Sequence, residues 1–289
     1  MSVLPEQIRA VNIGLPMFAD ALRAQDVAVQ HVDWRIPAGG DLAAVATLSR
    51  LYGDHGSAVD GANAEVVRRL DSGVPQLVEV STVEQAVPGV QGRTLLHCGP
   101  AIDFEQVCDP LRRSMRAAVV AEGWAADVEQ AQRLLAGGDV ALEPANHHQA
   151  VVPMASAIGP TAPVFVVADR EGGTRSYAPI SQGPGEVAWF GRDTDGAIER
   201  LRFLRDVAGP ALTRILSLAG PLDILNLAAQ GVSMGDDLHM RTQAATNLLV
   251  RTWLPQLAEL PDEQRGGMAR FLSGNHLFFL TLAMAAAKA

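Results

Sequence analysis

Apolar segments of two periodicities follow one another along the first 192 residues. Apolar side chains that recur every three to four residues predict amphipathic helices, and short β-branched runs predict strands buried on both faces. The pattern predicts helices at residues 15–25, 42–51 and 60–70 and strands at residues 27–34, 76–80, 94–97 and 164–168. Alternation of this kind favours an α/β layer with a mainly parallel sheet, in which functional side chains lie at the carboxyl ends of the strands.

Beyond residue 192 the spacing of apolar residues is helical almost throughout. Asp193 or Thr194 can cap a first helix, and Pro221 fits the first turn of another. Helical periods then cover residues 235–257 and the segment from Asn275 onward. We therefore expect an α/β domain over residues 1–192 and an all-helical region over residues 193–289.

The stretch from Glu143 to Asp169 is the strongest candidate for a functional site, because it combines adjacent imidazoles, four prolines and a buried strand. Only imidazole changes charge near neutral pH, so His147 or His148 is a candidate for proton transfer or for binding an anionic or carbonyl group. Neighbouring residues on a strand point to opposite faces, which makes a shared task for the two doubtful. Two hydrogen-bonded structural histidines are the equal alternative.

Two predicted strand ends carry further candidates. Asp33, Trp34 and Arg35 follow one strand, and His97 and Cys98 follow another. Arg35 is a candidate for substrate binding and His97 for catalysis. The alternative is that Trp34 and Cys98 belong to the core, while Asp33 and Arg35 form a local ion pair or cap.

Two polar helix starts complete the set of candidates. We expect a helix to begin at Gly235 with Asp237, His239 and Arg241 in its first turns, and another to open with Asn275 and His276. Helix N-termini attract anions, so converging starts would bind an oxyanion or carboxylate, although Asp236 and Asp237 oppose this. A solvated, capped turn with one ion pair is the alternative. We expect His97, one of the paired histidines and Arg241 to line one pocket.

Composition narrows the function. Of 289 residues, 48% are hydrophobic, which is enough for a substantial core. A formal net charge of -9, a pI near 5.2 and the lack of a basic cluster argue against a nucleic-acid surface. Lys288 is the only lysine and no GxxxxGK loop occurs, which disfavours Schiff-base chemistry and nucleotide phosphate binding.

The sequence also bears on the compartment. Cys98 and Cys108 are too few for a disulfide framework, and the first residues lack the apolar core of a signal peptide, so we expect the cytoplasm. Leu277 to Ala287 is the most apolar stretch, but a bilayer span needs about 20 residues. We expect it to be a buried helix and expect no membrane association.

Familiar metal and cofactor motifs are missing from the sequence. HExxH, CxxC and spaced His/Cys quartets do not occur, nor does GxGxxG. We therefore expect no intrinsic metal and no cofactor such as a nicotinamide or a flavin. Any chemistry would rest on histidine and arginine.

Several segments resemble the YahG/YlbE-like family across the whole chain. They are VNIGLPMFADALRAQDVAVQHVDWRIPAGG from Val11, TLLHCGPAI from Thr94, NHHQAVVPMASAI from Asn146, MGDDLHMRTQAAT from Met234 and GNHLFFLTLAMAAAKA from Gly274. Ile36 departs from the proline of many members. Family members continue well past this C-terminus, so the chain resembles their N-terminal portion.

The resemblance implies a subunit of oxamate carbamoyltransferase, which acts with an FdrA-like partner and a third subunit in anaerobic allantoin breakdown. That reaction converts oxalurate and phosphate into oxamate and carbamoyl phosphate, so the substrates are small anions. The first segment also resembles one carried by FdrA proteins. No catalytic residue is carried over. The alternative is a non-catalytic scaffold that docks the FdrA-like partner, and homo-oligomerisation stays open.

Overall fold

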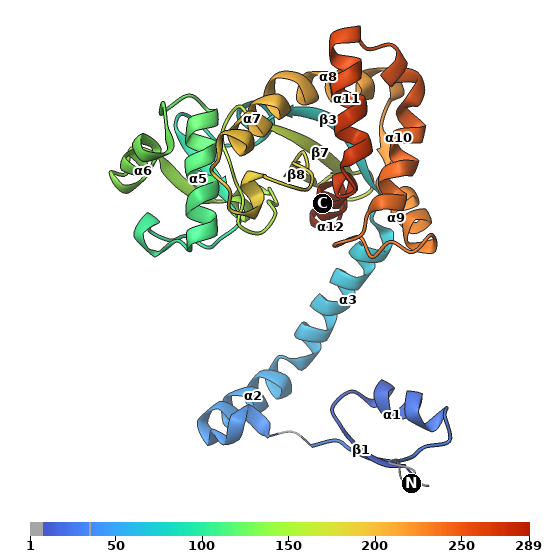
Figure 1. Ribbon diagram of the computed structural model, residues 1–289. Helices are drawn as coiled ribbons and strands as arrows, with labels where there is room; N and C mark the ends of the chain where they lie inside the picture. Colours follow the sequence, from blue (N-terminus) through green and yellow to red (C-terminus); the bar gives the residue numbers. More distant parts are fainter. Residues whose placement is uncertain (1–7, 35) are drawn as a thin grey trace, which may run out of the picture. The chain divides into compact units, whose positions relative to one another are not determined.

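The computed structural model describes residues 8–34 and 36–289 (Figure 1). Arg35, one of the predicted substrate-binding residues, lies outside the described residues. The chain divides into two compact units, Met1–Leu70 and Asp71–Ala289. The predicted boundary near residue 192 falls inside the second of them.

The first unit begins with a strand, helix and strand. β1 (Arg9–Ile13) and β2 (Ala28–Val32) pair in parallel and are connected through α1 (Pro16–Arg23). The 3-10 turn η1 (Pro37–Gly40) leads to α2 (Leu42–Asp54), and α3 (Gly56–Ser72) follows. Asp41 caps α2 by accepting hydrogen bonds from the backbone N–H groups of Ala43 and Ala44. The helices and the strand predicted here are confirmed, and β1 is additional.

Two sheets form the centre of the second unit. One has the order β8-β7-β3-β9, with β3 (Pro75–Thr82), β7 (Pro163–Asp169), β8 (Arg175–Pro179) and β9 (Leu222–Asp223). The other has the order β5-β4-β6, with β4 (Thr94–His97), β5 (Ala141–Pro144) and β6 (Ala157–Ile158). The predicted mixed α/β class is confirmed.

The expectation of a mainly parallel sheet is wrong for the four-stranded sheet. Every pairing in it is antiparallel, and β7 and β8 are joined by a short hairpin connection. In the smaller sheet β4 pairs in parallel with β5 and antiparallel with β6. The periodicity of a strand is the same in both orientations, so the sequence pattern could not distinguish them.

Helical elements surround these sheets in the second unit. They are α4 (Val83–Ala86), η2 (Phe104–Gln106), α5 (Asp109–Ala121), α6 (Val128–Ala136), η3 (Ala145–His148), η4 (Ala188–Phe190), α7 (Asp195–Phe203), η5 (Leu204–Ala208), α8 (Gly209–Ala219), α9 (Ile224–Ser233), α10 (Gln243–Ala258), α11 (Asp262–Gly274) and α12 (Phe278–Lys288). Thr194 caps α7 through the backbone N–H of Ala197, as expected. Pro221 instead precedes β9, and Asp223 caps α9.

The helices after residue 192 share one hydrophobic core with the four-stranded sheet. Phe165 on β7 makes an edge-to-face contact with Phe278 on α12, which also contacts Trp253 on α10 and Phe271 on α11. These helices and the sheet therefore bury one common set of apolar side chains, and the domain boundary near residue 192 stays a prediction. α12 is the buried helix predicted from its apolar sequence, and within the described part of the chain no helix is long and apolar enough to cross a membrane.

Candidate functional site

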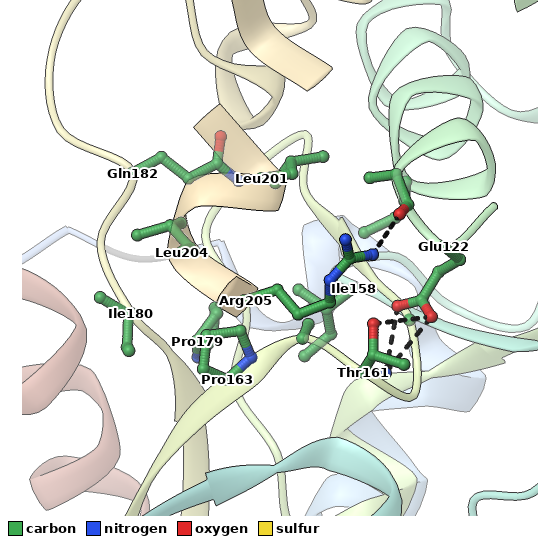
Figure 2. A pocket seen from close by; sticks show the side chains of 15 residues that line it. Glu122, Ile158, Thr161, Pro163, Pro179, Ile180, Gln182, Leu201, Leu204 and Arg205 are labelled. Atoms are coloured by element: carbon green, nitrogen blue, oxygen red, sulfur yellow. Dashed lines mark hydrogen bonds between the residues drawn. The ribbon is translucent and has the colours of Figure 1, made fainter. Parts of the chain in front are cut away.

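A pocket opens between the C-terminal end of α5, residues 157–163 and the helical segments α7 and η5 (Figure 2). It measures about 450 Å³, counting the space at its open mouth. Most of its wall is aliphatic, supplied by alanine, proline, leucine and isoleucine side chains. The polar side chains that line it are those of Glu122, Thr161, Gln182 and Arg205. Figure 2 shows Glu122 and Thr161 on one side and Leu204, Ile180 and Gln182 on the other.

Glu122 directly follows α5, and the loop after β6 holds its carboxylate. The backbone N–H of Thr161 donates to Oε1 at 3.1 Å, and the Thr161 hydroxyl donates to Oε2 at 2.9 Å. A Cβ atom at Gly159 would lie 2.2 Å from Oε1, so only glycine leaves room for the carboxylate there. The backbone of this loop and a residue without a side chain thus fix the position of Glu122.

The environment of Glu122 disfavours its charge. Burial in the aliphatic wall raises the pKa of the Glu122 carboxyl, while the hydrogen bonds from Thr161 and the nearby Arg205 guanidinium oppose that rise. Arg205 forms no ion pair with Glu122 among the described residues. Its guanidinium instead pairs with Asp206, with Nε at 2.7 Å, and donates from Nη1 to the carbonyl of Ala121 at 2.6 Å. The carboxylate therefore has hydrogen-bond donors but no paired cation.

The raised pKa of Glu122 predicts a specific pH dependence of stability. A pKa raised by folding favours the folded state at low pH, and this contribution is lost as the pH rises from the ordinary glutamate value of 4.5 through the folded value. We therefore expect Glu122→Gln to gain stability relative to the unmodified protein as the pH rises from 4 to about 8. Chemical denaturation at a series of pH values measures the difference. The exposed Glu199→Gln is the control, and a difference for Glu122→Gln that is constant over pH would contradict the expectation.

His97 lies at the end of β4 and is fully buried. Its Nδ1 accepts a hydrogen bond from the backbone N–H of Gly99 at 3.1 Å, while Nε2 is buried with no hydrogen-bond partner among the described residues. Burial lowers the pKa of the His97 imidazole. His97 does not line the pocket itself, but Ala157, which pairs with His97 across the sheet, is part of the pocket wall.

The paired histidines differ in their surroundings. His147 is exposed on η3, whereas His148 is half-buried and contacts the Glu143 carboxylate through Nε2 and the carbonyl of Pro88 through Nδ1. Both ring nitrogens of His148 therefore contact acceptor groups of the chain itself. This geometry favours the structural alternative for His148 and leaves His147 accessible.

The helix expected to begin at Gly235 begins instead at Gln243, so that part of the prediction is wrong. Asp237 holds the preceding loop, because its Oδ1 accepts from the backbone N–H groups of His239, Met240 and Arg241. The buried Asp236 carboxylate accepts from Ala244 and Ala245 at 3.1 and 2.7 Å. A carboxylate of the chain itself therefore occupies the N-terminus of α10, where an external anion was expected.

The second helix start is also satisfied internally. Asn275 is buried, donates to the carbonyl of Ser181 and accepts from the backbone N–H of Leu277. The two starts do converge, because the Thr242 hydroxyl donates to the carbonyl of His276 at 2.7 Å. Their meeting point is a packed junction, and a role of Asp237, His239, Arg241, Asn275 or His276 in substrate binding stays a prediction.

In the described part of the chain, no hydrogen bond or ion pair connects His97, His148 and Arg241 with one another. None of the described candidate residues lines the pocket. Glu122 is not among the residues predicted from the sequence. Its position in the sequence could have indicated a special role, because it follows the apolar run AAVVA and directly precedes Gly123. An acidic residue at the C-terminus of a helix is electrostatically unfavourable.

Comparisons with known proteins place these features in context. The family model described as oxamate carbamoyltransferase subunit AllG matches residues 140–289. In Escherichia coli (strain K12), the uncharacterized protein YahG is 29% identical over 100% of this chain and 62% of its own length. The oxamate carbamoyltransferase subunit AllG of the same organism is 34% identical over 81% of this chain and 57% of its own length.

A solved structure shares the fold. The crystal structure of a conserved protein of unknown function from Enterococcus faecalis V583 has a TM-score of 0.77 and 30% sequence identity, and covers 79% of this chain and 55% of that protein. The chain thus spans about three fifths of the length of the curated relatives that it matches. The Thr161 and Arg205 sides of the pocket fall within the segment that the family model matches, and Glu122 precedes it.

Proposed function

Because the chain belongs to the family of the oxamate carbamoyltransferase subunit AllG, we propose that it is a subunit of a carbamoyltransferase complex. The complex would act on oxalurate or oxamate and on phosphate in allantoin breakdown. An FdrA-like protein and a third subunit would be its partners, and the cytoplasm its location. The family match supports the subunit role, and the surface of the first unit is the structural observation that carries it.

Large apolar side chains of the first unit are exposed. Of its described residues only Ala19 is buried, and Leu42 and Val11 are 83% and 68% exposed. The other exposed members are Ile8, Ile13, Leu15, Met17, Phe18, Trp34, Ile36, Leu48, Leu51, Tyr52, Val66, Val67 and Leu70. Isolated soluble chains rarely leave so many large apolar side chains exposed in one unit, and a parallel pair of strands is normally covered on both faces. Association with another subunit would bury these side chains.

Charge on the exposed face of α2 should therefore break the complex. We expect Leu48→Asp combined with Leu51→Asp to lower recovery of the FdrA-like partner at least about tenfold in co-purification, because burying carboxylates against an apolar partner is costly. Leu218→Asp, at an exposed leucine of α8, is the matched control and should leave recovery unchanged. Equal recovery of the partner by the double variant and the unmodified chain would contradict the proposed interface.

A non-catalytic docking subunit is the second candidate. It is favoured by the separate hydrogen-bond networks around His97, His148 and Arg241. Activity of the assembled complex with each of His97, His147, His148 and Arg241 replaced in turn separates the two candidates. Losses of activity without loss of assembly would support catalysis in this subunit, and unchanged activity in all four would support docking.

A further inference from the structure

We propose that the pocket at Glu122 binds a small molecule through a primary amide or ureido group, whose N–H donors pair with the Glu122 carboxylate. The inference deepens the carbamoyltransferase role proposed above and rests on it, because amide and ureido groups are what such a reaction consumes and releases. The assignment stands on the position of the carboxylate, its unused acceptor capacity and the charge of its surroundings.

The carboxylate keeps acceptor capacity beyond what Thr161 uses. An ionised carboxylate offers about four lone-pair sites on its two oxygens. Thr161 is the donor in each hydrogen bond to Glu122 within the described part of the chain, with its backbone N–H shared between Oε1 and Oε2 and its hydroxyl on Oε2. A ureido group presents two parallel N–H donors that match the two oxygens of the Glu122 carboxylate, and a primary amide presents one N–H donor to the carboxylate.

The electrostatic surroundings select donors over anions. Glu122 lies at the C-terminal end of α5, where exposed carbonyl groups make the potential negative. Arg202 and Arg205 donate to two of these carbonyls, those of Val120 and Ala121, and Arg205 is also engaged by Asp206. A phosphate group would meet a carboxylate and an aliphatic wall with no unengaged cation among the described lining residues. A neutral N–H donor group meets none of these penalties.

The shape of the site adds a limit on the rest of the ligand. The wall opposite Glu122 is formed by the apolar side chains of Ile180, Leu204 and two prolines, together with Gln182, whose Oε1 accepts a hydrogen bond from the backbone N–H of Trp189. Most of this wall can therefore contact only apolar parts of a compact ligand. Arg205 lies beside the pocket, is partly exposed and uses three of its five N–H groups on Asp206 and Ala121. The remaining two can donate to a single carboxylate on the ligand toward the mouth, even though Asp206 already balances the charge of Arg205. The ligand class is thus a small amide or ureide that carries no more than one negative charge.

Oxamate and its N,N-dimethyl derivative form a matched pair of probes, because both carry a carboxylate and only oxamate has amide N–H donors. Calorimetric titration of the whole chain should give saturable binding of oxamate and at least about tenfold weaker binding of the dimethyl compound, since hydrogen bonds to a charged acceptor are lost. Glu122→Gln should weaken oxamate binding by a similar factor. The exposed Glu199→Gln should bind oxamate as the unmodified chain does.

The probe comparison on the unmodified chain needs no variant to fold, so the proposal stays testable if Glu122→Gln is unstable. Equal affinity for the two probes, or no saturable binding of oxamate, would overturn the Glu122 assignment. Co-purification with the FdrA-like partner tests the subunit role separately. Assembly with the partner but no oxamate binding would contradict only the assignment of the pocket. Oxamate binding without assembly would support the assignment of the pocket and contradict the proposed interface.

Discussion

Phe278→Ala is expected to lower the free energy of unfolding by about 3–5 kcal/mol, the usual cost of truncating a buried aromatic side chain. Phe278 is fully buried, and its ring lies 5.7 Å from that of Phe165, 5.9 Å from Phe271 and 6.5 Å from Trp253, all in edge-to-face geometry. Loss of this ring would open a cavity at the point where α10, α11 and α12 meet the sheet. Urea denaturation followed by tryptophan fluorescence measures the change.

Phe190→Ala is the matched control, because Phe190 is 54% exposed and its truncation should cost well under 1 kcal/mol of packing against Trp189. If the sheet and the C-terminal helices share one core, Phe278→Ala should shift a single unfolding transition of residues 71–289. A second transition confined to the helices, with the sheet unaffected, would instead indicate a separate helical domain of the kind expected after residue 192.

Asp236→Ala is expected to cost about 2–4 kcal/mol, because it leaves the backbone N–H groups of Ala244 and Ala245 without acceptors in a buried position. Thermal or urea unfolding measures the loss. Asp237→Ala removes the neighbouring carboxylate from an exposed loop where water can replace it, so it should cost less than about 1 kcal/mol. Equal losses in the two variants would show that burial of the cap has no effect.

Thermal unfolding in the presence of phosphate tests whether the N-terminus of α10 binds an external anion. With Asp236 in place, phosphate should not raise the melting temperature through the N-terminus of α10, since a carboxylate already occupies it. Protection of the unmodified chain by phosphate that is reduced in Arg241→Lys would contradict this and restore Arg241 as an anion ligand.

Much of the local structure could be predicted from the sequence, because it depends on short-range periodicity. The predicted helix at residues 42–51 and the strands at 76–80, 94–97 and 164–168 all correspond to observed elements, and α12 is buried as its composition indicated. The start of α10 was misplaced because MGDDLHMR has helical spacing, whereas Asp237 satisfies the backbone as a loop instead.

The candidate site was harder to predict, because its parts are far apart in the sequence. Histidines are natural candidates for catalysis in a sequence, but His97 is buried in the core and His148 contacts Glu143 and the carbonyl of Pro88. Glu122 has no motif around it. Its role depends on three residues that are distant in the sequence. Gly159 and Thr161 lie in the loop after β6, Arg205 lies in η5, and the fold brings all three to the end of α5.

The sequence by itself determined the mixed α/β class, many of the helices, the strands β2, β3, β4 and β7, and the family resemblance that the comparisons bear out. Only the tertiary structure decided the antiparallel order of the main sheet, the common core of sheet and C-terminal helices, and the pocket at Glu122. The physical reason is that periodicity records whether a side chain is buried, while strand direction, core sharing and the pKa of a carboxyl depend on which distant segment buries it.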